Sequence, residues 1–131
     1  MIRVAVQAPP IDVGAELDRH HAGGHGASAS FIGRVRGDDG LVELFLEHHP
    51  AMTEAGLREL ARAAAERWQL AALTLVHRVG AMAPGDTIVL VLASSPHRSE
   101  ALAACELLMD RLKNDLMVWK RETYQHGRVA W

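Results

Sequence analysis

The sequence is poor in cysteine, in long apolar runs and in any excess of one charge. Its single cysteine, Cys105, rules out an intrachain disulfide and is compatible with a reducing compartment. The longest apolar runs, such as residues 87–93, are far shorter than the roughly 20 residues that span a bilayer, and the N-terminus lacks the layout of a signal peptide. We therefore expect a cytoplasmic protein without a membrane segment.

Charge and length narrow the possibilities further. The formal net charge is only −2, so we expect no nonspecific nucleic-acid binding, which requires a basic excess. Any basic cluster must be local and directed at a small anion. The 131 residues are enough for one domain, 1–131, with its own core. The chain has no Walker loop, nucleophile elbow or dinucleotide-binding glycine pattern, so nucleotide hydrolysis and hydride transfer find no support.

Hydrophobic periodicity predicts an α+β domain. The predicted strands are 2–6, 27–36, 41–48, 73–79, 87–94, 117–124 and 128–131, and the predicted helices are 12–20, 53–68 and 95–113. Residues 37–40 and 83–86 have the glycine, proline and aspartate of tight turns, so we expect each turn to join two paired strands. This order predicts mainly antiparallel sheet with helices packed against it.

A helix start that carries basic residues is the most informative local feature. Ser95, followed by a proline, has the residue type of a helix N-cap. His97 and Arg98 come next, in a turn where the helix dipole favours negative charge, so we expect an anion to compensate them. The alternative is that Arg98 pairs with a carboxylate of the chain, Glu100 or Glu122.

Further cations lie at the ends of predicted strands and helices, where they could converge on a phosphate. Arg34 and Arg36 share one face of a predicted strand, and guanidinium donors match phosphate oxygens. Lys113 and Lys120 are candidates for proton transfer, because desolvation or nearby cations turn a lysine into a base. Lys113 has the alternative role of complementing the dipole at a helix C-terminus.

We expect structural roles for Cys105 and for the clustered histidines. Cys105 lies in an apolar stripe at helical spacing, where we expect a small buried hydrophobic residue rather than a reactive thiol. The clusters His20–His21, His25 and His48–His49 suggest a metal. However, adjacent histidines on a strand point to opposite faces, and no further ligands stand at zinc-like spacing. We expect neither a metal site nor a cofactor.

Ordered motifs give the chain a family resemblance. They are FIGRVR at 31–36, LEHHPAMT at 46–53, HRVG at 77–80, PGD at 84–86, HRS at 97–99 and WKRE at 119–122. Over about residues 27–122 the chain resembles the large, catalytic subunit of molybdopterin synthase. The resemblance implies an α/β hammerhead fold and a homodimer. The dimer would bind two copies of a small ubiquitin-like sulfur-carrier subunit to form a heterotetramer.

The resemblance also implies a reaction and the residues that perform it. Sulfur would pass from the carrier's C-terminal glycine thiocarboxylate to cyclic pyranopterin monophosphate in two transfers, forming the dithiolene of molybdopterin. Lys113 and Lys120 match the family's active-site lysines. The substrate-binding segments match Arg34, Val35, Arg36, His97, Arg98, Lys113, Lys120, Arg121 and Glu122. In this interpretation Arg36 and Arg98 hold the phosphate, while the lysines move protons and stabilise charge.

The chain departs from the family pattern at a few positions. His49 stands where tyrosine is common and Ala51 where glycine is common, which affects turn geometry but no catalytic group. Many members continue with a tail that supplies a basic residue to the neighbouring subunit, whereas this sequence ends at Trp131. Either Arg128 substitutes for that residue or the site uses fewer cations.

Two other functions stay open at this point. The chain could be a noncatalytic protein that binds a ubiquitin-like sulfur carrier or a phosphorylated small molecule. It could also be a small phosphate-binding enzyme that is unrelated to pterins and needs no partner protein.

Overall fold

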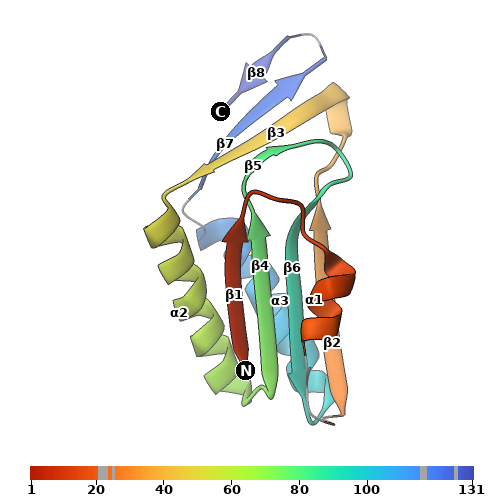
Figure 1. Ribbon diagram of the computed structural model, residues 1–131, viewed down its shortest axis with the longest axis vertical. Coiled ribbons are helices and arrows are strands. Elements are labelled where there is room, and N and C mark those ends of the chain that lie inside the picture. Colours follow the sequence, from red (N-terminus) through yellow and green to blue (C-terminus); the bar gives the residue numbers. More distant parts are fainter. Residues whose placement is uncertain (21–23, 25, 116–117, 126) are drawn as a thin grey trace.

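Two four-stranded sheets and three α-helices make up the computed structural model, which describes residues 1–20, 24, 26–115, 118–125 and 127–131 (Figure 1). In chain order the elements are β1 (Ile2–Gln7), α1 (Val13–Arg19), β2 (Ala27–Arg34), a 3-10 turn η1 (Asp38–Gly40), β3 (Leu41–His48), α2 (Pro50–Trp68), β4 (Ala72–Arg78), β5 (Gly80–Met82), β6 (Thr87–Ser95), α3 (Arg98–Asp115), β7 (Val118–Tyr124) and β8 (Val129–Ala130).

The first sheet has the strand order β1-β4-β6-β2 and packs against helices on both faces. β1 and β4 are parallel, and the other neighbours are antiparallel. Alternate side chains of the strands face opposite ways. Leu75 and Val91 therefore pack towards α2 and α3, whereas Val76 and Leu90 pack towards the segment that carries α1. Figure 1 shows α1 in front of this sheet and α3 behind it. Burial on both faces explains why β4 and β6 are almost continuously apolar.

The second sheet has the order β5-β3-β7-β8, and its neighbouring strands are all antiparallel. It lies beyond one end of the first sheet, at the top of Figure 1. A small apolar cluster of Val35, Leu46, Val79 and Met82 fills the junction between the two sheets. The prediction of a mixed α+β fold with mainly antiparallel sheet is confirmed.

The turn at 37–40 does not join two paired strands, so that prediction is wrong. β2 pairs with β6 in the first sheet, whereas β3 pairs with β5 and β7 in the second. The chain leaves β2 through an irregularity after Gly33, and Val35 exchanges backbone hydrogen bonds of 2.9 Å with Asp86 and Gly85. Turn residues specify a reversal but not a partner strand. Because Val35 is buried between the two sheets, the chain passes from the first sheet into the second instead of pairing β3 with β2.

The turn at 83–86 directly joins β5 to β6, which belong to different sheets. Asp86 closes it with a backbone hydrogen bond to Ala83 (3.0 Å), and its side chain accepts from the Ala83 amide (2.9 Å). β4 and β6, the two strands expected on either side of this turn, do pair antiparallel, as predicted. The chain also forms the short strand β5 before this turn, which periodicity did not predict.

α2 confirms the amphipathic helix predicted at 53–68 and begins three residues earlier. The ring of His49 accepts a hydrogen bond from the Met52 amide (3.4 Å) and so caps the helix, with a proline in the first turn. Leu57, Ala61 and Ala64 form its buried stripe. A left-handed residue, Gln69, ends the helix.

α3 begins at Arg98, so the prediction that Ser95 caps it is wrong. Ser95 is the last residue of β6 and lies opposite Ala27 of β2. Its hydroxyl donates to the carbonyl of His97 instead of accepting from a helix amide. Ser95, which has the residue type of a helix cap, is therefore a strand residue paired with β2.

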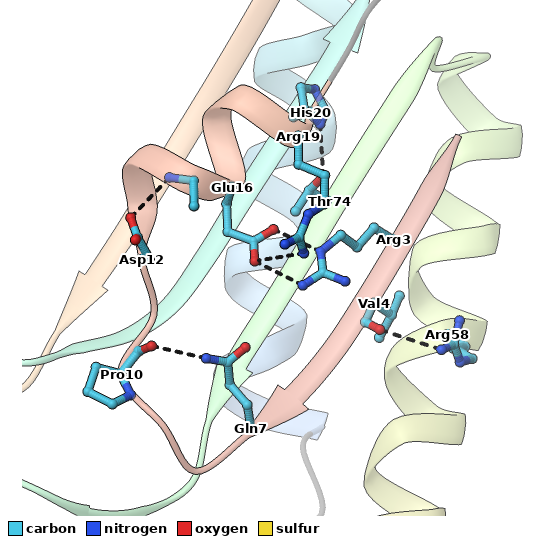
Figure 2. Close-up of polar contacts among 11 residues, drawn as sticks. Arg3, Val4, Gln7, Pro10, Asp12, Glu16, Arg19, His20, Arg58 and Thr74 are labelled. Atoms are coloured by element: carbon cyan, nitrogen blue, oxygen red, sulfur yellow. Dashed lines mark hydrogen bonds and ion pairs between the residues drawn. The ribbon is translucent and has the colours of Figure 1, made fainter.

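A buried carboxylate holds α1 on the first sheet (Figure 2). Glu16 accepts two hydrogen bonds from Arg3, of 2.8 and 2.9 Å, and lies 3.5 Å from Arg19. The Arg3 hydrogen bond is the main reason why the pKa of Glu16 lies below its usual value. Asp12 caps α1 through the Ala15 amide (3.0 Å), close to the predicted start at residue 12.

His20 extends this contact into the centre of the sheet. Its two ring nitrogens lie 2.8 Å from the hydroxyls of Thr74 and Ser94, on β4 and β6. Ser28 adds a 2.7 Å hydroxyl contact to Ser94. Burial, with a smaller effect of the N-terminal amine, lowers the pKa of His20. This histidine therefore serves to satisfy two buried hydroxyls.

Candidate functional site

Three polar side chains form a connected row on one face of β7. Lys120 Nζ lies 3.1 Å from Glu122 Oε1, and the Tyr124 hydroxyl donates to Glu122 Oε2 over 2.6 Å. Residues two apart on a strand share a face, so the row follows the strand. The hydrogen bond from Tyr124, followed by that from Lys120, lowers the pKa of Glu122. The Lys120 side chain remains 60% exposed, so its ammonium group is held in place and open to solvent.

Arg121 lies on the opposite face of β7. Its guanidinium stacks over Phe45 at 4.9 Å and over Trp131 at 5.6 Å from the ring centroids. It also lies 3.8 Å from a carboxylate oxygen of Glu43. The predicted substrate-binding run 120–122 is therefore divided between two faces of the second sheet.

The segment 34–36 meets β7 at the junction between the sheets. Val35 is 4% exposed and packs in one cluster with Leu46. Leu46 stands directly opposite Lys120 in the β3–β7 ladder. The structure thus brings Val35 and its flanking arginines to the part of the molecule that carries Lys120.

Arg34 and Arg36 do not share a strand face, contrary to prediction. β2 ends at Arg34 after the irregularity that follows Gly33, which places Arg36 outside the strand. Both arginines are exposed, and Arg36 lies 3.0 Å from Asp38. Because this ion pair is itself exposed, it would yield readily to a stronger anion.

Lys113 lies in the last turn of α3 and is exposed. The helix has 18 residues, about 27 Å of length. It runs back along β6 and β2, so its end lies near the beginning of β7 (Figure 1). Lys113 and Lys120 are the only lysines in the sequence, and both belong to this end of the molecule.

His97 and Arg98 lie at the other end of the first sheet. In the β2–β6 ladder Ala27 is opposite Ser95, whereas Arg34 is opposite Thr87. At about 3.3 Å per residue these two positions are roughly 23 Å apart along the strands. One chain therefore does not bring His97 and Arg98 together with the segment 34–36, and the phosphate contact predicted for Arg36 and Arg98 does not form within a single copy.

The alternative pairing of Arg98 is not formed either. Within the described part of the chain Arg98 has no ion pair. Glu100 accepts from the Ser99 hydroxyl (3.0 Å), and Glu122 is engaged on β7. A backbone hydrogen bond and then the Ser99 hydroxyl lower the pKa of Glu100. His97 and Arg98 thus remain exposed at the start of the helix.

A groove of about 530 Å³ lies between α2, along most of its length, and the second half of α3. Its lining residues are Met52, Thr53, Gly56, Leu57, Glu59, Leu60, Ala63, Arg67, Leu107, Arg111 and Leu112. Since Leu112 precedes Lys113, the groove borders the candidate site. Its mostly aliphatic lining suits an apolar chain segment better than a phosphate.

Comparison with known proteins identifies the family. The family model described as MoaE protein matches residues 6–115. The chain belongs to this family. A molybdopterin synthase catalytic subunit from Ralstonia nicotianae is 46% identical over 132 residues, which cover 97% of this chain and 75% of that protein.

Solved structures of the family share the fold. A molybdopterin biosynthesis MoaE protein from Burkholderia ambifaria MC40-6 has a TM-score of 0.86 at 39% identity, over 100% of this chain and 88% of that one. Molybdopterin synthase from Staphylococcus aureus has a TM-score of 0.85 at 28% identity, over 96% and 95% of the two chains. The two-sheet architecture is therefore that of the MoaE family.

Sequence reasoning overlooked Tyr124, the third member of the row on β7. A signal was present, because Lys120, Glu122 and Tyr124 alternate at strand spacing. The motif 119–122 drew attention to four consecutive residues and ended before the tyrosine. The relevant pattern on a strand is every second residue.

The histidine clusters have different roles where the structure describes them. His20 binds two hydroxyls and His49 caps α2, while His21 and His25 lie outside the described residues. In the described ranges, His, Cys, Asp and Glu side chains form no group of three that could hold a metal ion.

Cys105 is buried, as predicted. It is 7% exposed within the α3 core, and burial raises the pKa of its thiol. It is therefore unsuited to act as a thiolate. Among the described helices, none is long and apolar enough to cross a membrane.

Proposed function

We propose that this protein is the catalytic subunit of molybdopterin synthase. It transfers sulfur from the C-terminal thiocarboxylate of a small ubiquitin-like carrier subunit to cyclic pyranopterin monophosphate, forming the molybdopterin dithiolene. The observation that carries the proposal is family membership together with 46% identity to a relative of that name. The protein acts as a homodimer within a heterotetramer. Its location is the cytoplasm, since a chain with a single cysteine requires no oxidising compartment.

Lys113 and Lys120 are the proposed catalytic residues. Two exposed amines near one end of the molecule are suited to move protons and to stabilise charge as sulfur attacks the pterin. The proposed substrate-binding residues are Arg34, Val35, Arg36, His97, Arg98, Lys113, Lys120, Arg121 and Glu122. The packing of Val35 on Leu46, opposite Lys120, supports a shared site for the segment 34–36 and β7.

A site that uses all these residues needs two copies of the chain. Within one copy, roughly 23 Å of strand separate Arg34 from the residues before His97. In the proposed homodimer, His97 and Arg98 of one copy complete the site that contains Lys120 of the other. The shared site supplies the phosphate with guanidinium donors from both copies.

Mixed dimers test this arrangement. A dimer of one Arg98→Ala chain and one Lys120→Ala chain retains one intact site if Arg98 acts across the dimer, so it should have about half of the wild-type activity. If both residues act within one copy, neither site is intact and the mixed dimer is as inactive as the parental variants. The second outcome would refute the shared site.

Reconstitution tests the function itself. The purified chain, combined with thiocarboxylated carrier and cyclic pyranopterin monophosphate, should form the dithiolene product, measured after conversion to a fluorescent oxidised pterin. Carrier labelled with ³⁵S should transfer its label to the product. Formation of an intact complex without any product would reject the proposal and favour a noncatalytic carrier-binding protein.

A further inference from the structure

Tyr124, the last residue of the row on β7, belongs to neither the proposed catalytic nor the proposed substrate-binding residues. We infer that Tyr124 is a positioning residue: through the Glu122 carboxylate it holds the Lys120 ammonium in place for the sulfur-transfer reaction. This inference rests on the proposed function, because it takes Lys120 to be catalytic. Tyr124 does not itself touch the reacting atoms.

The two oxygens of Glu122 are divided between two donors. Oε1 is paired with Lys120 at 3.1 Å, and Oε2 accepts from the Tyr124 hydroxyl at 2.6 Å. A carboxylate held at both oxygens is restrained in rotation, so the position of Lys120 depends on Tyr124. Without the hydroxyl, the carboxylate is free to turn towards water, and the long lysine side chain regains its rotamer freedom.

The ring of Tyr124 is held from its other side by Arg128. The Arg128 guanidinium lies 4.2 Å from the ring centroid. The backbone of the β7–β8 hairpin fixes both residues, since the Tyr124 amide donates to the Arg128 carbonyl over 2.9 Å. Arg128, a basic residue that the sequence suggested for the site, is thus engaged in supporting Tyr124.

The row contributes little to holding the fold together. The Glu122 side chain is 21% exposed and that of Lys120 is 60% exposed, and exposed ion pairs add little stability. β7 is bound to the sheet by its own ladder with β3, from Val118 to Tyr124. A network that is ordered but nearly dispensable for folding is suited to orient a reactive group.

Tyr124→Phe is the direct test, because it removes only the hydroxyl. We expect kcat to fall about threefold to tenfold, the value of one hydrogen bond, with carrier binding unchanged. The Tyr124 hydroxyl is the first cause of the low pKa of Glu122, so its loss raises that pKa. The acid limb of the pH–kcat profile should therefore move to higher pH.

Thr123→Val provides the matched control. It removes a hydroxyl from the adjacent residue of β7, whose side chain lies on the other face of the strand. Its kcat and pH profile should match those of the wild type. A Thr123→Val variant with the same loss as Tyr124→Phe would show that any hydroxyl removed from β7 is harmful, and would overturn the inference.

A double-mutant cycle with Glu122→Gln shows whether Tyr124 acts through Glu122. If it does, Tyr124→Phe has little further effect once the carboxylate is gone. Fully additive losses in kcat would mean that the two residues act separately, and would refute the inference.

Titration of the Glu122 carboxyl by ¹³C NMR needs no substrate. Tyr124→Phe should raise the Glu122 pKa, and an unchanged titration would contradict the inference even if kcat fell. Because this measurement is independent of product formation, a wild-type chain that makes no dithiolene would reject the proposed function, while the titration still decides whether Tyr124 controls Glu122.

Discussion

Glu16 and Glu122 are two carboxylates with similar local chemistry and different surroundings. Each is held by two side chains: Glu16 by hydrogen bonds from Arg3 and an ion pair with Arg19, and Glu122 by Lys120 and Tyr124. The pKa of each carboxyl is lowered, and in each case a hydrogen bond is the first cause. The contacts alone do not separate a structural pair from a functional one.

Burial separates them. The Glu16 side chain is 7% exposed and lies between α1 and the first sheet, so its arginine partner is committed to holding these elements together. Glu122 is 21% exposed, and its lysine partner is 60% exposed. An exposed ammonium group can meet a ligand, whereas Arg3, which binds a buried carboxylate through two hydrogen bonds, cannot be withdrawn without leaving that charge unpaired. The comparison predicts that the first pair supports folding and the second supports the reaction.

Removal of Lys113 or Lys120 should have the largest effect of all the changes, lowering activity without changing stability. Lys120→Ala and Lys113→Ala should each lower the rate of product formation by a factor of about 100 or more, the usual value of a proton-transferring side chain. Their free energies of unfolding should stay within about 0.5 kcal/mol of the wild type, because both side chains are exposed. Single-turnover assays and urea unfolding measure the two quantities.

Arg62→Ala is the control for the lysine variants. Arg62 is an exposed cation on the outer face of α2, where it pairs with Glu59 and Glu66. It should leave both activity and stability nearly unchanged. Lysine variants that bind the carrier normally and keep the wild-type rate would show that these amines are not catalytic.

Glu16→Gln should have the largest effect on stability. The variant leaves Arg3 without its charged partner, and we expect the free energy of unfolding to fall by about 2 kcal/mol, somewhat less than for a fully buried pair because Arg3 is partly exposed. Glu66→Gln, at an exposed pair on α2, should cost less than about 0.5 kcal/mol. If urea unfolding shows that the two variants lose the same free energy of unfolding, burial does not explain the difference between Glu16 and Glu122.

The smallest effect is a pH dependence of stability that comes from His20. Its pKa is lowered in the folded protein, chiefly by burial, so the unfolded chain binds a proton first as the pH falls below about 6.5. The free energy of unfolding should therefore decrease from pH 7 towards pH 5. His20→Gln should flatten this part of the curve, and an unchanged slope in urea titrations would argue against the buried neutral imidazole.

Much of the fold follows from periodicity. The continuous apolar runs of β4 and β6 and the amphipathic stripe of α2 were predicted close to their observed bounds. The pairing of the strands predicted at 73–79 and 87–94 is confirmed, whereas the pairing predicted across the turn at 37–40 is wrong. The difference arises because residue types in a turn report local conformation, whereas the partner of a strand depends on which distant apolar side chains it buries.

The sequence predicted which residues belong to the candidate site but not how they are arranged in space. Motifs identified the segments around Arg34, Arg98 and Lys120, but not that one chain places Arg98 at the far end of the first sheet. The strand alternation that joins Lys120 to Tyr124 was present in the sequence and was obscured by attention to consecutive residues.

The sequence by itself determined the element types, the buried role of Cys105 and the residues that make up the family's motifs, because these depend on spacing and residue chemistry along the chain. Only the tertiary structure decided that β2 and β3 belong to different sheets, that Arg98 lies at the far end of the first sheet from Arg34, and that Glu122 is shared between a lysine and a tyrosine. These features depend on which surfaces are buried against one another, and burial is a property of the folded chain as a whole.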